Sequence, residues 1–306
     1  MRLDLTWDLS LQWSTITSIT LPILIGVAYF SRVGRLRERH RQPRLWRQAS
    51  FTVGLAAIVL VTVGPIDDLA DNLVFGHMVQ HILLLEEISL LLALGLTGPI
   101  LGPILTKPGF RQLRGLTHPV AAFAIWAVVM FGWHAPPAYQ LAAENEVVHL
   151  FEHASFVAAG VLMWLAMLGP FPKPEWFGNG AKAVYVAAIH FTSMVLANVL
   201  MWSGTVIYPL YLASDRAHRI SPITDQSLAG VVLMAQSALL MFGMLAWLLL
   251  RWAQQDTERQ ELIDLAYEHG IELDERRARR AVAAGRTAEL RNRLLSSSTG
   301  RTPKPS

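Results

Sequence analysis

Cysteine is absent from all 306 residues of this chain. Its absence excludes disulfide bonds, thiolate metal sites and cysteine nucleophiles, so any soft metal must be bound by histidine and methionine. Charged residues are also scarce, at 16% of the sequence, whereas hydrophobic residues make up 53%. This composition is too apolar for an ordinary soluble domain, and it predicts an integral membrane protein.

Long apolar runs recur along the chain, each close to the roughly 20 residues that a helix needs to cross about 30 Å of hydrocarbon. They lie near residues 13–30, 50–66, 77–98, 118–134, 148–168, 183–203 and 228–250. We therefore expect an all-α protein in which residues 1–250 form a seven-helix transmembrane bundle. Residues 251–306 combine mixed charge with helical apolar spacing. They predict a cytoplasmic tail that is partly helical and then disordered from Ser296 onward.

Lysine and arginine are retained on the cytoplasmic side of a membrane, and their distribution here is one-sided. Of the 26 basic residues, 23 lie in the first, third and fifth interhelical loops and in the tail. Only Arg2, Arg216 and Arg219 lie on the other side. We therefore expect the amino terminus outside and the carboxyl terminus in the cytoplasm. Because these residues serve as topology signals and can meet anionic lipid, they do not indicate nucleic-acid binding.

Paired histidines open two of the predicted spans. His77 and His81, in "HMVQH", open the third, and His149 and His153, in "HLFEH", open the fifth. The spacing of four residues places each pair on one helix face, about 6 Å apart. His134, in "FGWHAPPAY", ends the fourth span at the same level. Since ionisable groups inside a span are costly, the five histidines predict a metal or cofactor site at the outer leaflet.

Copper is the predicted metal, because soft side chains lie next to the histidines. Neutral imidazole suits copper, zinc and iron alike, but Met78, beside His77, adds a thioether that favours Cu(I). Packing is the alternative role for this methionine. In the sixth span, His190 and Met194 lie four residues apart. They would form a lower station for copper if the metal crosses the membrane.

Carboxylates accompany the histidines in two places. Glu152, inside "HLFEH", would orient an imidazole as a hydrogen-bond acceptor or bind the metal itself. Glu86 and its neighbour Glu87 follow His81 by five and six residues, inside the hydrocarbon. Glu86 would relay a proton or a cation inward, and a protonated structural pair is the alternative.

Three other functions remain open at this point. "HLFEH" matches H-x-x-E-H, which in one class of zinc protease supplies two ligands and a general base. In an intramembrane zinc metallopeptidase, however, the "HMVQH" pair would be redundant. A membrane haem needs only one histidine from each facing helix, and the two pairs exceed that number. A copper transporter across the cytoplasmic membrane would use the same ligands as a copper-delivery factor.

The same residues lie in short motifs that follow one another in a fixed order. The motifs are "HMVQH" followed by "LLLALGLTGP", then "HPV", "WHAPPAY", "VVHLFEHASFVAAGVLMW", "YPLY" and "ITDQSLAGVV". They cover residues 50–250, approximately. In these motifs the sequence closely resembles the seven-helix bacterial cytochrome c oxidase assembly factors of the CtaG type, which are associated with caa-type oxidases.

The resemblance implies a non-enzymatic factor of the bacterial cytoplasmic membrane that handles copper destined for a haem-copper oxidase. Its partners would be oxidase subunits or a periplasmic copper donor, together with the lipid bilayer. The functional positions of the family fall on His77, His81, His134, His149, Glu152, His153, Asp225 and Gln226. Asp225 and Gln226 would close the site or bind a partner at the outer mouth of the seventh helix, with helix capping as the alternative for Asp225.

Overall fold

The computed structural model describes residues 9–106 and 113–299, and no β-strand occurs among them. The prediction of an all-α protein is therefore confirmed for this part of the chain. Two units divide the chain, residues 1–240 and residues 241–306. The last long helix contributes to both units, since it begins before residue 240 and ends after it.

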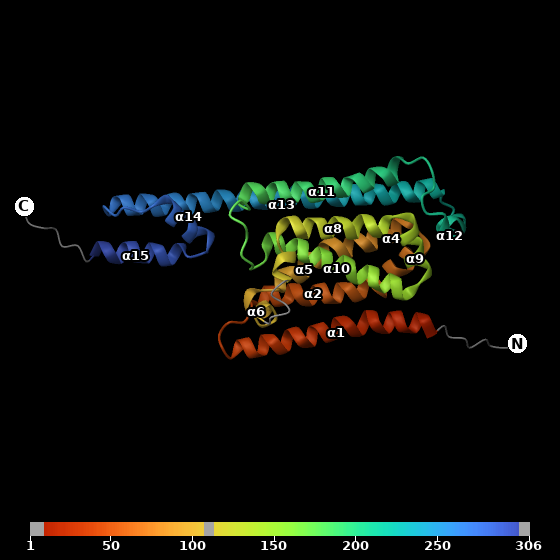
Figure 1. The fold of residues 1–306 in the computed structure, drawn as a ribbon, viewed down its shortest axis with the longest axis horizontal. Coiled ribbons are helices and arrows are strands. Elements are labelled where there is room, and N and C mark those ends of the chain that lie inside the picture. The colour runs from red at the N-terminus through yellow and green to blue at the C-terminus, as the bar shows by residue number, and fades with distance from the viewer. Residues whose placement is uncertain (1–8, 107–112, 300–306) are drawn as a thin grey trace, which may run out of the picture. The chain divides into compact units, whose positions relative to one another are not determined.

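The first unit is a bundle of helices of very different lengths (Figure 1). Its helices are α1 (Leu9–Arg37), α2 (Leu45–Thr62), α3 (Pro65–Asn72), α4 (Val74–Ile82), η1 (Leu83–Ile88), α5 (Ser89–Gly95), α6 (Gly98–Thr106), α7 (Leu113–Leu116), α8 (Pro119–His134), α9 (Pro136–Glu144), α10 (Glu146–Leu168), α11 (Asn179–Trp202), η3 (Pro209–Tyr211), α12 (Leu212–Ala217) and the first part of α13 (Pro222–Glu268). Helix α10 packs against α8, η1 and α5, and α2 packs against α5 and α1. Helices α9 and α12 lie at one end of the bundle, here called the α9 end (Figure 1).

Six helices are long and apolar enough to cross a membrane, and the number rises to seven if α8 and α9 form one bent span. The axes of α8 and α9 differ by 72° at the break. Two prolines after Ala135 explain this break, because proline has no N–H for the preceding helix and holds the residue before it in an extended conformation. Each apolar run of the sequence coincides with one of these helices.

The span that carries His77 and His81 is not a regular α-helix. Between α4 and α5, the segment η1 has π-helical hydrogen bonding and contains Glu86 and Glu87. The Ser89 hydroxyl donates to the Leu84 carbonyl oxygen at 2.7 Å. A π-segment inserts one extra residue into a helical turn and is frequent at functional sites. The third predicted span therefore contains an interruption of regular α-helical hydrogen bonding at the two carboxylates.

Helix α10 approaches this π-segment closely because residue 160 is glycine. A Cβ atom added to Gly160 would lie 1.9 Å from the Leu85 carbonyl oxygen and 2.6 Å from the Ser89 hydroxyl oxygen. Neither contact is sterically acceptable, and the first involves backbone, which cannot rotate away. The close approach brings the histidine-bearing turns of α4 and α10 opposite one another.

Replacing Gly160 with alanine is therefore expected to destabilise the protein by about 3 kcal/mol, since overpacking against backbone forces helices apart. Thermal unfolding of the purified protein in detergent measures this loss. Gly132→Ala is the matched control, because nothing lies within 4 Å of a Cβ atom at that position. The control should be neutral or slightly stabilising, as alanine favours helix over glycine by about 1 kcal/mol. Equal unfolding temperatures for the two variants would contradict the proposed helix contact.

The second unit consists of the continuation of α13 with α14 (Glu275–Ala283) and α15 (Thr287–Thr299). It has a small apolar core of its own, in which Leu262, Ala266, Val282 and Leu290 are buried. Helix α13 continues without a break past residue 250, where the tail was expected to begin. Residues 296–299, the start of the segment expected to be disordered, belong to α15. The rest of that segment, residues 300–306, lies outside the described residues.

Candidate metal centre

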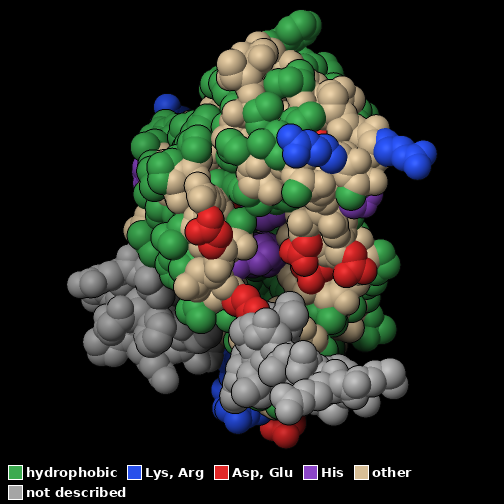
Figure 2. Space-filling model, turned by 90° about the vertical axis from the view of Figure 1, so that its right-hand side faces the viewer, with side chains coloured by type: hydrophobic (Ala, Val, Ile, Leu, Met, Phe, Trp, Pro, Cys, Tyr) green, Lys and Arg blue, Asp and Glu red, His purple; other side chains and the backbone are tan. Residues whose placement is uncertain are grey.

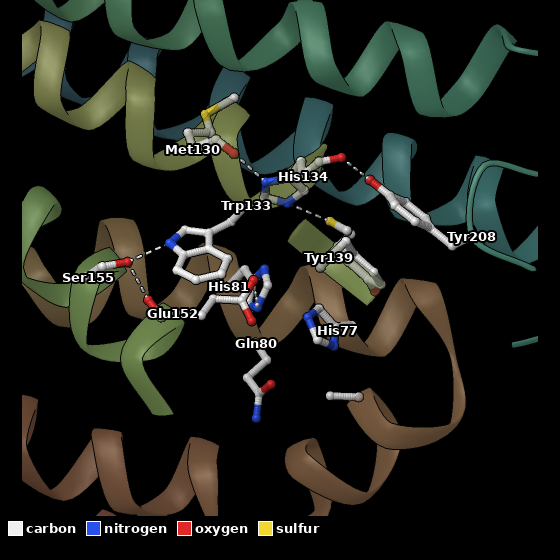
Figure 3. Close-up of polar contacts among 12 residues, drawn as sticks. His77, Gln80, His81, Met130, Trp133, His134, Tyr139, Glu152, Ser155 and Tyr208 are labelled. Carbon is white, nitrogen blue, oxygen red and sulfur yellow. Dashed lines mark hydrogen bonds and ion pairs between the residues drawn. The ribbon is translucent and has the colours of Figure 1, made fainter. Parts of the chain in front are cut away.

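Helices α4 and α10 bring four side chains to one point inside the bundle. They are His77 and His81 from α4, and His149 and Glu152 from α10, here called the His/Glu cluster. One nitrogen or oxygen atom from each of the four lies within 4.8 Å of the others. Figure 3 shows Glu152 directed toward His81, with His77 beside it. Two histidines four residues apart on one helix thus face a histidine and a carboxylate three residues apart on another.

Most of the polar atoms in the His/Glu cluster have no hydrogen-bond partner among the described residues. This holds for His77 Nε2, both ring nitrogens of His81, His149 Nε2 and both carboxylate oxygens of Glu152. His81 Nε2 and Glu152 Oε1 lie 3.6 Å apart across the two helices. Each buried polar atom left without a partner costs about 1–3 kcal/mol. So many at one point indicate a place built for a ligand with positive charge.

A tyrosine hydroxyl fixes the orientation of the His77 ring. Tyr211 Oη lies 3.2 Å from His77 Nδ1, 3.0 Å from Tyr139 Oη, and donates to the Ala70 carbonyl oxygen at 3.2 Å. A phenol has one proton, so when Tyr211 donates to Ala70, the hydrogen in its contact with His77 is supplied by Nδ1. His77 Nε2 is then left with a lone pair directed at the cluster, which is the form of histidine that binds metals.

Two further tyrosines, Tyr139 and Tyr208, lie beside the His/Glu cluster at the α9 end. Their rings stack with centroids 4.0 Å apart, and Tyr139 also lies 4.8 Å from the His77 ring. The Tyr208 hydroxyl donates to the His134 carbonyl oxygen at 2.8 Å, at the end of α8 (Figure 3). Sequence reasoning did not select the tyrosines, although they lie within the motifs "WHAPPAY" and "YPLY".

His134 and Met78 contact each other rather than joining the His/Glu cluster. His134 Nε2 lies 3.1 Å from Met78 Sδ, and His134 Nδ1 lies 2.6 Å from the Met130 carbonyl oxygen. The His81 ring is 5.5 Å from the His134 ring. The sequence had assigned all five histidines, with Met78 as an additional soft ligand, to one metal site. The structure brings them into one region but separates this pair from the cluster.

His153 is adjacent to the His/Glu cluster without belonging to it. Its ring lies 4.1 Å from that of His149 and 5.7 Å from that of His81. Its Nε2 atom is buried and has no partner among the described residues. A small rearrangement of this ring would bring a further nitrogen to the His/Glu cluster.

Asp225 and Gln226 hold the surroundings of the site in place. Asp225 lies on α13, and its carboxylate accepts hydrogen bonds from the backbone N–H groups of Val74 (2.7 Å) and Phe75 (3.0 Å). It therefore caps α4, the helix that carries His77, rather than its own helix. Gln226 accepts from Ile207 N at 2.7 Å and donates to the Ser203 hydroxyl at 2.8 Å, which fastens the loop before Tyr208.

A cavity of about 20 Å³ lies inside the bundle, next to the histidines of α4 and α8. Met78, His81 and His134 line one part of it, and Glu86, Ser193 and Gln236 line another. The Gln236 amide donates to Glu87 Oε1 at 3.0 Å. Glu86 therefore borders the same cavity as His81 and His134.

His190 and Met194 do not join this region in the described structure. His190 is buried on α11, and its Nδ1 atom has no partner among the described residues. Met194, one turn further along, is only half-buried. Of the two residues of the predicted lower station, only His190 is therefore buried.

The α9 end of the molecule is hollowed above the histidines. Figure 2 shows histidine side chains at the bottom of this hollow and acidic side chains around it. Burial raises the pKa of Asp67, on α3, to about 6. Its carboxylate accepts a hydrogen bond from the buried Gln80 amide at 2.7 Å, which links α3 to the histidine-bearing turn of α4. A concave surface with acidic groups concentrates cations at its base.

The fold and this site together define a multi-pass helical membrane protein with a buried cluster of histidines and a carboxylate. The profile of one family, described as the cytochrome c oxidase caa3 assembly factor, matches residues 27–255. The chain belongs to this family, as the motifs had indicated.

Other comparisons identify relatives whose names give no function. Proteins named as uncharacterized in Mycobacterium bovis and Mycobacterium tuberculosis are each 22% identical to this chain over 253 residues. An uncharacterized protein of Mycobacterium leprae is 21% identical over 253 residues. These alignments cover 76% of this chain and 38% of each relative, so the chain spans well under half their length. No solved structure matches the chain.

Proposed function

We propose that this protein binds copper at the His/Glu cluster as cargo and hands it to a haem-copper oxidase during assembly. Membership of the caa3 assembly-factor family supports the destination of the metal. The observation that carries the copper proposal is the set of buried nitrogen and oxygen atoms without partners, contributed by α4 and α10. The role is binding and transfer, with no catalytic step.

The donor atoms fit copper. Three imidazole nitrogens and one carboxylate oxygen form a set that suits borderline metals, including Cu(II) and Zn(II). His77, His81, His149 and Glu152 would hold the ion, and His153 would supply a further nitrogen. Haem fits less well, because ring centroids 4.1 to 5.7 Å apart leave no space between the histidines for a macrocycle.

The proposed setting is the bacterial cytoplasmic membrane, crossed seven times. In this arrangement α8 and α9 together make one span, the amino terminus lies outside and the carboxyl terminus lies in the cytoplasm. The one-sided distribution of arginine and lysine supports this orientation. It places the hollow at the α9 end on the outer face, where a periplasmic copper donor or an oxidase subunit would dock.

The first test is elemental analysis and a visible spectrum on one sample purified in detergent without chelator and reconstituted with copper. The wild type should hold near-stoichiometric copper with no Soret band. A variant with His77, His81, His149 and His153 all changed to Ala should lose at least about 100-fold in copper affinity, since each ligand or its partner contributes 10–100-fold. A variant with His118, His218 and His269 changed to Ala controls for the loss of exposed or half-buried histidines elsewhere.

The alternatives give different results in the same experiment. A Soret band lost in the variant would identify a haem protein, and zinc that copper does not displace would support the metallopeptidase. A wild type that stays metal-free after copper reconstitution would contradict the proposal.

Transport of copper across the membrane is a second candidate, favoured by the cavity that leads from His81 to Glu86 and Gln236. A carrier would need such an inward path, whereas a delivery factor would release copper on the side where it was bound. Copper uptake into vesicles containing the purified protein separates the two. Accumulation above that of protein-free vesicles would favour the carrier.

A further inference from the structure

The contact between His134 and Met78 defines which atom of the imidazole carries hydrogen. A carbonyl oxygen only accepts hydrogen bonds, so the 2.6 Å contact between His134 Nδ1 and the Met130 carbonyl oxygen places a hydrogen on Nδ1. In the neutral ring, Nε2 then has a lone pair. This lone pair faces Met78 Sδ, 3.1 Å away, and a thioether sulfur carries no hydrogen.

Two lone pairs at this distance repel each other unless a positive charge lies beside both atoms. A second proton on His134 would supply that charge, but both side chains are buried, with exposed fractions of 8% for His134 and 1% for Met78. No carboxylate forms an ion pair with His134 in the described part of the chain, and the nearest ring is another imidazole, His81. A buried charge without a partner is strongly unfavourable. A metal ion would satisfy both atoms.

The distance between the two atoms is that of two ligands on one metal. With typical metal–nitrogen and metal–sulfur bonds, ligands at right or tetrahedral angles lie about 3.1–3.5 Å apart. The cavity of about 20 Å³ begins at these residues and is lined by Met78 and His134. A volume of roughly 10–15 Å³ holds one water molecule, so the space suits a single ion. The distance between the two atoms, the tautomer of His134 and the volume of the cavity all favour one bound metal ion.

We propose that Met78 and His134 form a second metal station, selective for Cu(I), beside the His/Glu cluster. The inference rests on the proposed copper function and assigns a different oxidation state of copper to each of the two stations. The thioether selects the soft ion, whereas the carboxylate of Glu152 suits a divalent one. His81 lies between the stations, with ring centroids 4.1 Å from His77 and 5.5 Å from His134, and both its nitrogens lack partners among the described residues. It is therefore the residue through which an ion passes from one station to the other.

The two stations can be probed separately with Cu(I) under anaerobic conditions and with Zn(II). Met78→Leu preserves volume and removes the sulfur, so it should weaken Cu(I) binding at least about 10-fold, measured by competition with a chromophoric Cu(I) chelator, as expected for the loss of a metal-site group. Its Zn(II) affinity should stay within about twofold of the wild type, because the His/Glu cluster is intact. Met163→Leu is the matched control, since Met163 is equally buried on α10. It should behave as the wild type with both metals.

X-ray absorption at the copper edge gives a readout that does not depend on the stability of a variant. Wild-type protein labelled with selenomethionine should show copper–selenium scattering when loaded with one equivalent of Cu(I). Absence of this scattering, or unchanged Cu(I) affinity in Met78→Leu, would overturn the second station. Zn(II) binding would still test the His/Glu cluster, so the proposed function could survive. A wild type that binds neither metal would overturn both.

Discussion

Glu152→Gln is expected to lower the affinity for Cu(II) and Zn(II) by about 10–100-fold, because the carboxylate lies within the set of ligand atoms. Its oxygen is 3.6 Å from His81 Nε2, and the side chain is fully buried at 0% exposure. Glutamine keeps the shape of the side chain and removes the negative charge that offsets a divalent ion. Isothermal titration with Zn(II), and competition assays with Cu(II), measure the change.

The same variant separates a copper-binding factor from a metallopeptidase. In a peptidase that uses "HLFEH", the glutamate acts as a general base on metal-bound water rather than as a ligand. Glu152→Gln would then abolish peptide cleavage and leave the metal in place. Retained metal affinity with lost cleavage of a peptide substrate would therefore contradict the copper proposal.

Glu146→Gln is the matched control for this experiment. Glu146 lies in the first turn of α10, on the same helix as Glu152, and it is outside the His/Glu cluster. The control should bind both metals as the wild type does. In cells, oxidase activity should fall with Glu152→Gln and remain with Glu146→Gln. Excess copper in the growth medium should partly restore it, because mass action offsets a weaker site.

The positions of the paired histidines could be predicted from the sequence because they depend on local geometry. A spacing of four residues places His77 with His81, and His149 with His153, on single helix faces wherever the helices pack. The cost of placing imidazoles in a span then makes it reasonable to expect that two such faces meet. The apolar runs likewise located the long helices, since length and hydropathy are local properties.

Contacts between distant parts of the chain could not be predicted in this way. The direction in which Met78 and His134 point depends on the rotation of α4 and α8, which packing decides and the sequence pattern does not record. The π-segment at Leu83–Ile88, with the sequence LLLEEI, contains no glycine or proline that would mark a departure from a regular α-helix. Gly160, which permits α10 to approach it, was one glycine among 21. Its role became visible only through the position of Leu85 across the helix interface.

Asp225 illustrates the same limit and leads to a large expected effect. Its position near the start of α13 predicts a cap for its own helix, yet its carboxylate accepts from Val74 N and Phe75 N, about 150 residues earlier in the chain. These N–H groups belong to the first turn of α4, where no intrahelical acceptor is available. His77 follows three residues after Val74, so this cap fixes the turn that carries a proposed metal ligand.

Asp225→Ala is expected to lower the free energy of unfolding by about 3 kcal/mol. Hydrogen bonds to charged groups contribute about 1.5–3 kcal/mol, and helix caps about 0.5–2 kcal/mol. The unfolding temperature in detergent should fall by roughly 5 °C for a chain of this size. Asp225→Asn should give an intermediate loss. The amide oxygen of asparagine can accept one of the two hydrogen bonds, but its NH2 group replaces the second acceptor and faces the other backbone N–H. Asp68→Ala, at an exposed position on α3, should change stability by less than about 0.5 kcal/mol.

Metal binding distinguishes a cap that only stabilises from one that also positions His77. Measured well below its unfolding temperature, Asp225→Ala should still bind Zn(II) more weakly than Asp68→Ala, since a frayed first turn of α4 no longer holds the His77 ring in place. Loss of stability with unchanged Zn(II) affinity would limit Asp225 to a structural role. An unchanged unfolding temperature would contradict the cap itself. The expected joint loss would mean that a residue of the last long helix sets the geometry of a ligand on α4, so that movement of α13 could release the metal.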